Sequence, residues 1–348
     1  MTGRHLLGVD GGNTKTVALL AMPSGELIAA DRELGCADLH SVGPQRALEV
    51  INGAIDKTLT MAAVEPSSIR VSSFSLAGAD WPENLQLLRR SLQRRWPRPL
   101  IVNDALGALR SAVPSGLAVV VAAGTGATTA ARAADGSTWH AGFWQQTQGS
   151  AELAEQALRA IYRADLGIDP PTKLTSRLLS ELGVRDVEAI LHDLSRRTSA
   201  VSPEIGSLAP TILDVAEEGD ATARQIVVDH GTGLGHMAVA AARRVGIEDR
   251  PFSIVLVGGL FRHPGALMRE ALLSALRSSA PLAIESPPAY SPSAGGLLLA
   301  FDAAGIRIAG DVERRLLRTM PSDELFDTHP RALVGTRAAS VIDESDKF

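Results

Sequence analysis

The chain has 348 residues, of which 45% are hydrophobic and 21% charged, enough for about two domains with cores of their own. Its one cysteine, Cys36, excludes an internal disulfide and any cysteine-only zinc or iron–sulfur site within one chain. The net charge of −5 argues against a dedicated nucleic-acid surface, and no apolar run reaches membrane-spanning length. We therefore expect a cytoplasmic protein with no nucleic-acid or membrane partner.

The first 112 residues predict the element order β-β-β-α-β-α-β-α. Two apolar runs on either side of a Gly-Gly turn, over residues 5–20, are typical of a β-hairpin, and a third strand follows at 26–30. Apolar residues at helical spacing predict a helix over 44–63. The later elements are a strand at 70–76, a helix with a solvated basic face at 85–96, a strand at 100–102 and a helix at 105–112.

The same order restarts in the second half, which indicates a duplicated topology. A meander of three strands comes first, and a mainly helical insertion over 151–245 interrupts the order before it is completed. The expected elements are strands at 117–123, 128–132, 137–141, 252–257 and 282–284, and helices at 265–278 and 293–303. We predict domains at 1–112 and 113–305, with the last helix, about 293–305, packing back on the first domain. The tail, 306–348, has weak signals: a short helix at 314–317 and a frayed end at 343–348.

Two glycine-rich turns follow apolar strands at equivalent places in the two halves, Gly11-Gly12 and Gly124-Thr125-Gly126. Glycines let backbone N–H groups approach an anion closely, and a carboxylate beside them, Asp10, is a natural place for hydrated Mg²⁺. The first turn is not a Walker A loop, because no Gly-Lys-Ser/Thr follows, and an ordinary hairpin turn is the alternative for it. Two such turns predict that both halves face one cleft and hold one polyphosphate, with Gly258-Gly259 beside the adenosine.

Asp104 ends the strand at 100–102, where a carboxylate can accept the proton of an attacking substrate hydroxyl. The alternative is that Asp104 caps the next helix. His230 and His236 are six residues apart on a presumed helix, so they do not share a face and indicate no metal site. Trp139 and Trp144 are expected in the core.

Taken together, these motifs resemble the N-acetylglucosamine kinase and BadF/BadG/BcrA/BcrD-type ATPase family of the actin, Hsp70 and sugar-kinase superfamily, over about residues 5–305. The pieces most typical of the family are residues 8–16, 102–105, 123–126, 257–260 and 293–296. The resemblance implies an α/β fold of two duplicated ribonuclease-H-like domains, the actin-like ATPase type. It also implies that ATP and Mg²⁺ bind in the cleft between these domains.

The resemblance further assigns roles to single residues. It implies that Asp10 positions Mg²⁺ through water and that Asp104 is the general base toward a sugar hydroxyl. The nucleotide-binding residues would be Gly11, Gly12, Asn13, Thr14, Lys15, Gly124, Thr125, Gly126, Gly258 and Gly259. The substrate-binding residues would be Asp38, His40, Gly78, Asp80, Thr147 and Gln148.

Two segments depart from the family pattern. Relatives often carry Gly-x-Ala-Asn where this chain has Gly-Cys-Ala-Asp over 35–38, so an amide becomes the carboxylate of Asp38 near the expected sugar. Relatives also carry Gly-Asp-Glu-Gly-Ser where this chain has Gln-Thr-Gln-Gly-Ser over 146–150, so both acids are lost at Thr147 and Gln148. If those acids hold the sugar or order the site, the departures change substrate choice or activity.

The sequence therefore predicts an ATP-dependent kinase of an amino sugar or related hexose, such as N-acetylglucosamine or glucosamine, that acts as a homodimer on a small-molecule sugar. One alternative is a non-catalytic ATP- or sugar-binding sensor, which the lost acids favour and the retained Asp10 and Asp104 oppose. A less favoured alternative is an ATPase activator of a dehydratase. Such activators normally use two cysteines per chain for a shared cluster, and this chain has only Cys36.

Overall fold

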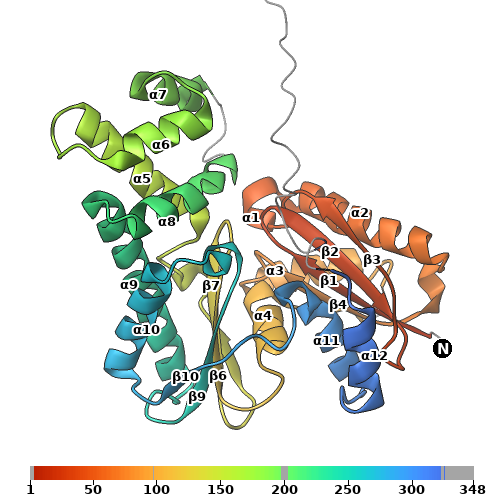
Figure 1. The fold of residues 1–348 in the computed structure, drawn as a ribbon. Coiled ribbons are helices and arrows are strands. Elements are labelled where there is room, and N and C mark those ends of the chain that lie inside the picture. Colours follow the sequence, from red (N-terminus) through yellow and green to blue (C-terminus); the bar gives the residue numbers. More distant parts are fainter. Residues whose placement is uncertain (1–3, 97, 197–202, 323–324, 326–348) are drawn as a thin grey trace, which may run out of the picture.

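The computed structural model describes residues 4–96, 98–196, 203–322 and 325. Two α/β domains lie side by side, each built on one five-stranded sheet (Figure 1). The strand orders are β3-β2-β1-β4-β5 in the first domain and β10-β9-β6-β7-β8 in the second. Read from β8, the second order repeats the first, so the predicted duplication of topology and the α/β fold class are confirmed.

The first sheet begins with the predicted hairpin. Strand β1 (His5–Gly11) pairs antiparallel with β2 (Lys15–Ala21), which pairs antiparallel with β3 (Leu27–Leu34). Strands β4 (Ile69–Leu76) and β5 (Leu100–Asn103) continue the sheet parallel to β1. The carboxyl ends of β1, β4 and β5 therefore meet at one edge, where ligands bind in open α/β sheets.

The second sheet has the same pairing. Strand β6 (Ala118–Ala123) pairs antiparallel with β7 (Ala127–Arg132), and β7 pairs antiparallel with β8 (Thr138–His140). Strands β9 (Phe252–Val257) and β10 (Ala283–Glu285) run parallel to β6. The strand predicted at 252–257 has the observed bounds, because its apolar run is continuous and is bounded by Pro251 and glycine.

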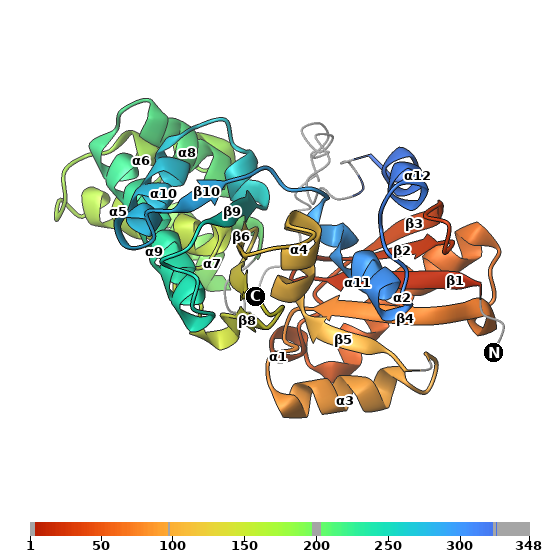
Figure 2. The same cartoon turned by 90° about the horizontal axis from the view of Figure 1, so that it is seen from below.

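Helices cover both faces of each sheet. In the first domain, α2 (Pro44–Ala62) and α3 (Pro82–Leu92) cover one face of the sheet and α11 (Gly295–Ala303) the other. Helix α4 (Asp104–Ala112) lies between the two sheets (Figure 2). Helix α3 begins and ends earlier than the predicted 85–96, because Pro82 starts it and a turn after Leu92 buries Trp96.

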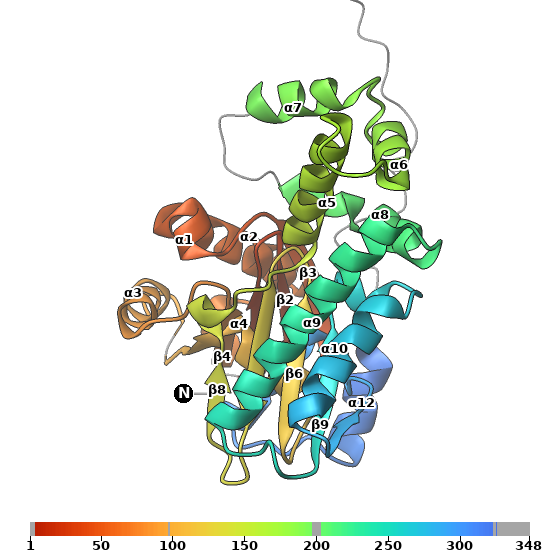
Figure 3. The same cartoon turned by 90° about the vertical axis from the view of Figure 1, so that its left-hand side faces the viewer.

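The second sheet is covered by α9 (Ala221–Arg244) and α10 (Leu267–Ser279), and the inserted helices extend past its end (Figure 3). No helix in the described ranges is both long and apolar enough to span a membrane. The remaining short elements are α1 (Leu39–Val42), α5 (Ser150–Asp165), α6 (Lys173–Leu182), α7 (Val187–Arg196), α8 (Ala209–Glu217), α12 (Asp311–Thr319), and the 3-10 turns Pro66–Ser68, Gly142–Trp144, Pro203–Leu208, Gly259–Arg262 and Pro292–Ala294. Helix α12 contains the predicted 314–317, whereas 343–348 lie outside the described residues.

Helix α11 lies so close to β1 that no side chain fits between the two backbones. A Cβ atom on Gly296 would come within 2.4 Å of the Val9 carbonyl oxygen, and one on Gly8 within 2.1 Å of the Leu297 nitrogen. Backbone atoms cannot yield as the end of a flexible side chain can. The position of α11, and of the Pro292–Ala294 turn just before it, is therefore fixed on the end of β1.

We expect Gly296→Ala to lower the free energy of unfolding by about 1–3 kcal/mol or more, because the added methyl group overlaps the β1 backbone. Gly53→Ala in α2 is a matched control. Its Cβ would meet only the flexible Glu33 carboxylate, at 3.3 Å, and alanine favours a helix. Denaturant titration of both variants checks this, and equal stabilities would contradict the close packing of α11.

Candidate nucleotide and sugar site

The predicted turns lie at the carboxyl ends of the central strands. The turn with Gly11 and Gly12 follows β1, that with Gly124–Gly126 follows β6, and Gly258 follows β9. The two hairpin turns meet across the domain boundary, since a Cβ atom on Gly126 would lie 3.2 Å from Asn13 Nδ2. The structure thus brings together the two turns that the sequence assigns to one polyphosphate.

The hairpin turns present free backbone donors. The Gly12 N–H donates to the Lys15 carbonyl and the Gly124 N–H to the Gly126 carbonyl, so these two groups close the turns themselves. Within the described residues, the N–H groups of Asn13, Thr14 and Thr125 have no acceptor. No protein atom lies within 4 Å of where a Gly124 Cβ would be. This arrangement suits an anion held by the tips of both turns.

A cavity of about 380 Å³ adjoins the second turn, and its size suits a nucleoside. Its walls come from the Gly124 turn, from the start of α8 and from the turn after β9. The lining residues are Gly124, Thr125, Ser150, Gly206, Ser207, Ala209, Pro210, Leu213, Gly259, Leu260, Arg262, His263 and Pro264. Residues 206–213 belong to the helical insertion, and no local sequence pattern marks them as part of a site.

The two glycines of the pair Gly258-Gly259 have different surroundings. A Cβ on Gly258 would come within 2.3 Å of the Ala123 carbonyl oxygen, and its φ of 105° is one that other residues rarely adopt. Glycine is thus required there by the close approach to β6. Gly259 is exposed and lines the cavity, so it is placed to contact a nucleoside.

Asp10 ends β1 beside the first turn. Burial raises the pKa of Asp10 to about 6, while a hydrogen bond with the Ser293 side chain and the charge of Lys15 oppose the shift. Ser293 belongs to the Pro292–Ala294 turn that the close packing of α11 holds against β1. Nothing in the sequence around Ser293 indicates that its motif lies at the end of β1, so this contact could not be predicted from the sequence.

Asp104 occupies the first turn of α4 but does not cap it. The cap is Asn103, whose side chain accepts a hydrogen bond from the Ala105 N–H. The alternative reading of Asp104 as the helix cap is therefore wrong. Burial raises the pKa of Asp104 to about 7, and the negative charges of Asp10 and Asp80 add to the shift. A carboxylate with a pKa near neutrality suits a general base.

Asp38 and Asp80 stand near Asp104. Asp38 caps α1, because its carboxylate accepts hydrogen bonds from the His40 N–H and the Ser41 hydroxyl. Asp80 accepts a hydrogen bond of 2.9 Å from the Asn103 side chain. Burial and the charge of Asp38 raise the pKa of Asp80, and His40 opposes the shift. Asp38, Asp80 and Asp104 thus lie close together, and we call these three carboxylates the acidic group.

The Asp38 carboxylate packs directly against Gly78. A Cβ atom at position 78 would lie 2.3 Å from Asp38 Oδ1, so a larger residue there would clash with Asp38. Three aromatic rings from the two domains meet beside this region. Phe143 of the second domain meets His40 edge-on at 4.9 Å and stacks with Trp81 at 5.9 Å between ring centroids. Trp144 is exposed rather than in the core, because the turn at Gly142–Trp144 presents it to solvent, whereas Trp139 is partly buried against the core of the second domain.

Thr147 and Gln148 lie with the phosphate turn and α9, not with the acidic group. Thr147 fills the space left by Gly233 of α9, where a Cβ would come within 2.2 Å of its Oγ1. The Gln148 side chain accepts from the Ala127 N–H at 3.2 Å and donates to the Gln145 carbonyl at 2.6 Å. The Gln148 side chain thereby connects the turn next to Gly126 to the Gln145 backbone. This clamp needs a side chain that can donate and accept a hydrogen bond at the same time, as an amide does.

The Gln148 backbone is held as firmly as its side chain. Its N–H donates to the Glu152 carboxylate at 2.5 Å, and its carbonyl lies 3.0 Å from Nε2 of the buried His230. Burial lowers the pKa of His230, so a neutral ring that donates to this carbonyl is favoured. His230 therefore supports the loop.

Mg²⁺ fits the residues present. This ion keeps several waters and is held by one or two carboxylates plus substrate phosphates. Asp10 supplies such a carboxylate beside the turns, and the described part of the chain has no group of three or more His, Cys, Asp or Glu that could hold a metal by themselves. Asp10 is the residue that would hold Mg²⁺ here, and the ion itself stays a prediction.

Solved structures define the class of fold. A putative N-acetylglucosamine kinase from Chromobacterium violaceum matches with a TM-score of 0.67 at 24% identity, covering 86% of this chain and 100% of that one. A ROK family glucokinase from Streptomyces griseus, in complex with glucose and AMPPNP, matches with a TM-score of 0.52 at 16% identity, covering 86% and 98%. The fold is the two-domain fold of actin-like sugar kinases.

Sequence comparison identifies the family. The model of the BadF/BadG/BcrA/BcrD ATPase family matches residues 7–300, and the chain belongs to this family. The N-acetyl-D-glucosamine kinase of Dictyostelium discoideum is 24% identical over 319 residues, which cover 87% of this chain and 99% of that protein. The resemblance stated from the motifs is confirmed.

We expect Gln148→Glu, which introduces the family's own residue, to weaken ATP binding by about tenfold. The carboxylate loses the donor to Gln145 and adds negative charge beside Glu152 and the phosphates. Gln146→Glu is the matched control, because this exposed neighbour gains the same charge without those contacts. Calorimetric titration measures the affinity of each variant for ATP. Equal affinities for the two variants would show that the hydrogen bonds of the Gln148 side chain do not contribute to ATP binding.

Proposed function

We propose that this protein is an ATP-dependent kinase that phosphorylates a hydroxyl group of an amino sugar or related hexose. The observation that carries the proposal is the position of Asp104. Its carboxylate, with a pKa near 7, lies in the same cleft as Asp10 and the two phosphate turns. Membership of an ATPase family supports ATP as the co-substrate.

The geometry supports direct transfer of the terminal phosphoryl group. The tips of the two turns hold the polyphosphate with backbone N–H groups, which stabilises the charge of the transferred group. Asp104 accepts the proton of the sugar hydroxyl as its oxygen attacks phosphorus and the bond to ADP breaks. Mg²⁺, when bound, neutralises phosphate charge, and closure of the two domains excludes water.

The relatives support an amino sugar as the acceptor. One is named as an N-acetyl-D-glucosamine kinase, and the enzyme of Clostridium acetobutylicum, 19% identical over 273 residues, as an N-acetylmuramic acid/N-acetylglucosamine kinase. The acidic group of this chain, which includes Asp38 and Asp80, suits a positively charged amine. A homodimer and a location in the cytoplasm stay predictions.

The two alternatives have less support. A non-catalytic sensor does not need a buried carboxylate whose pKa is tuned to neutrality, and such shifts cluster at catalytic sites. A dehydratase activator needs cysteines that two chains can share around one cluster. Cys36 is half-buried in the first domain, where its sulfur lies 3.8 Å from Asn13 Oδ1 beside the phosphate turn.

We expect Asp104→Asn to lower turnover by roughly 100-fold or more, through loss of proton acceptance, with little change in ATP affinity. Wild-type turnover should rise from about pH 6 to about pH 8 as Asp104 loses its proton, and the variant should lack this rise. A coupled assay of ADP release over several sugars measures both, and unchanged turnover in Asp104→Asn would exclude Asp104 as the base.

The same variant should be more stable than the wild type at alkaline pH. The folded pKa of Asp104 is raised from 3.8, so ionisation costs the folded state free energy, and the cost grows between about pH 4 and about pH 7. Asparagine does not ionise. Melting temperatures should therefore diverge at about pH 8 and converge at about pH 4, which separates loss of chemistry from loss of fold.

We expect Asp38→Asn to lower the ratio of kcat/KM for glucosamine to that for N-acetylglucosamine. Asparagine still caps α1, because it is a favoured cap residue, but it removes the charge that attracts a protonated amine. Steady-state kinetics with the two sugars give the ratio before and after the change. A ratio that stays the same would assign Asp38 to loop structure alone.

A further inference from the structure

A second cavity, of about 560 Å³, lies at the hinge between the domains. The chain crosses there between α4 and β6, and again between β10 and α11. The two crossings are paired by hydrogen bonds from the Ala289 N–H to the Ala112 carbonyl and from the Tyr290 N–H to the Ser111 carbonyl. The first crossing, with Pro114, lines the cavity, so the cavity has walls from both domains and from the link.

One wall of this hinge cavity is aliphatic. Leu100 and Val102 come from β5, the edge strand of the first sheet, Leu106 and Leu109 from α4, and Leu299 from α11. Side chains from three elements thus give the cavity an apolar wall that a hydrocarbon body can contact.

The other wall carries an excess of positive charge. Arg110, Arg132 and Asp302 are the charged residues that line the cavity, with a net charge of +1. Arg110 uses Nε and Nη2 to bind Asp302, and Arg132 uses Nε and Nη2 to bind the Gly116 and Val113 carbonyls. Within the described residues, Nη1 of each guanidinium makes no hydrogen bond. Burial lowers the pKa of Arg132, and the charge of Arg110 adds to this.

The hinge cavity is separate from the nucleotide site. Helix α4 begins at Asp104 in the cleft and reaches Arg110 six residues later, a rise of roughly 9 Å. Strand β7 likewise begins beside the phosphate turn and ends at Arg132. The two sites lie at opposite ends of the same elements.

We propose that the hinge cavity binds a monocarboxylate with an apolar body. A single carboxylate matches the net charge of +1, its two oxygens match guanidinium donors, and the aliphatic wall takes the hydrocarbon. A dianion would leave negative charge uncompensated in a partly buried place. The proposal does not depend on the kinase activity, because binding is measured without ATP or sugar.

The test is calorimetric titration of the full chain with sodium octanoate, with 1-octanol as the neutral probe of the same length. We expect octanoate to bind at least tenfold more tightly than 1-octanol. Arg110→Met should weaken octanoate binding by about tenfold, because the cavity loses its net charge. Asp302→Asn, at an exposed position, should tighten it by about threefold, because a negative charge is removed.

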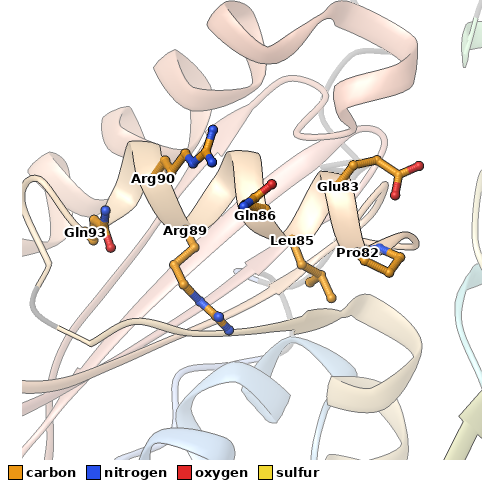
Figure 4. A pocket seen from close by; sticks show the side chains of 7 residues that line it. All are labelled: Pro82, Glu83, Leu85, Gln86, Arg89, Arg90 and Gln93. Carbon is orange, nitrogen blue, oxygen red and sulfur yellow. The ribbon is translucent and has the colours of Figure 1, made fainter.

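The hollow along α3 provides the control site (Figure 4). It also has arginines and a leucine, but all of its lining residues come from the segment 82–93, and Arg89 and Arg90 point to different sides of the helix. Arg90→Met should leave octanoate binding unchanged. Equal affinity for octanoate and 1-octanol, or equal affinity of the wild type, Arg110→Met and Asp302→Asn for octanoate, would overturn the proposal.

Discussion

The burial of several carboxylates in one cleft is the constraint on which the rest of this structure depends. Asp10 lies near the end of β1, Asp104 follows β5, and Asp80 follows β4 through a short turn. The hydrogen bonds of the parallel sheet fix the distances between these strand ends, so the carboxylates cannot move apart. Burial is the main cause of the raised pKa values of Asp10 and Asp104, and for Asp104 this effect is joined by repulsion from Asp10 and Asp80. Positive charge brought by a ligand relieves this repulsion, which links stability to binding.

Backbone packing without side chains holds the groups that support these carboxylates. Gly8 and Gly296 let α11 lie directly on β1. This contact places the Ser293 side chain where it forms a hydrogen bond with Asp10. A Cβ on Gly295 would likewise come within 2.2 Å of the Gly107 carbonyl oxygen, so α11 is fitted to α4 as well. Helix α11 is thus packed against both β1, which carries Asp10, and α4, which carries Asp104, although it contributes neither carboxylate.

The sequence was informative wherever the signal is local. Hairpin turns, apolar strands and the strand-end position of Asp104 follow from neighbouring residues, and the structure bears out these elements. Contacts between distant segments could not be predicted in this way. No local pattern indicates that residues 206–213 of the insertion line the nucleoside cavity, or that Gln148 holds the Ala127 N–H. The close approach of Gly258 to the neighbouring strand β6 is another contact between distant segments that no local pattern indicates.

The two departures from the family pattern act at opposite ends of the cleft, and their charges have opposite signs. Beside the phosphate turn, Thr147 and Gln148 replace two acids, so the loop that approaches the polyphosphate loses negative charge while Gln148 keeps it ordered. At the sugar end, Asp38 replaces an amide and adds negative charge next to Asp80. Compared with the family pattern, negative charge has thus been lost on the side proposed to bind ATP and gained on the side proposed to bind the sugar. A neutral phosphate loop reduces repulsion of ATP, and a more acidic acceptor pocket favours a cationic sugar. The departures are therefore physically consistent with one another and with a working kinase, rather than with the decay of its site.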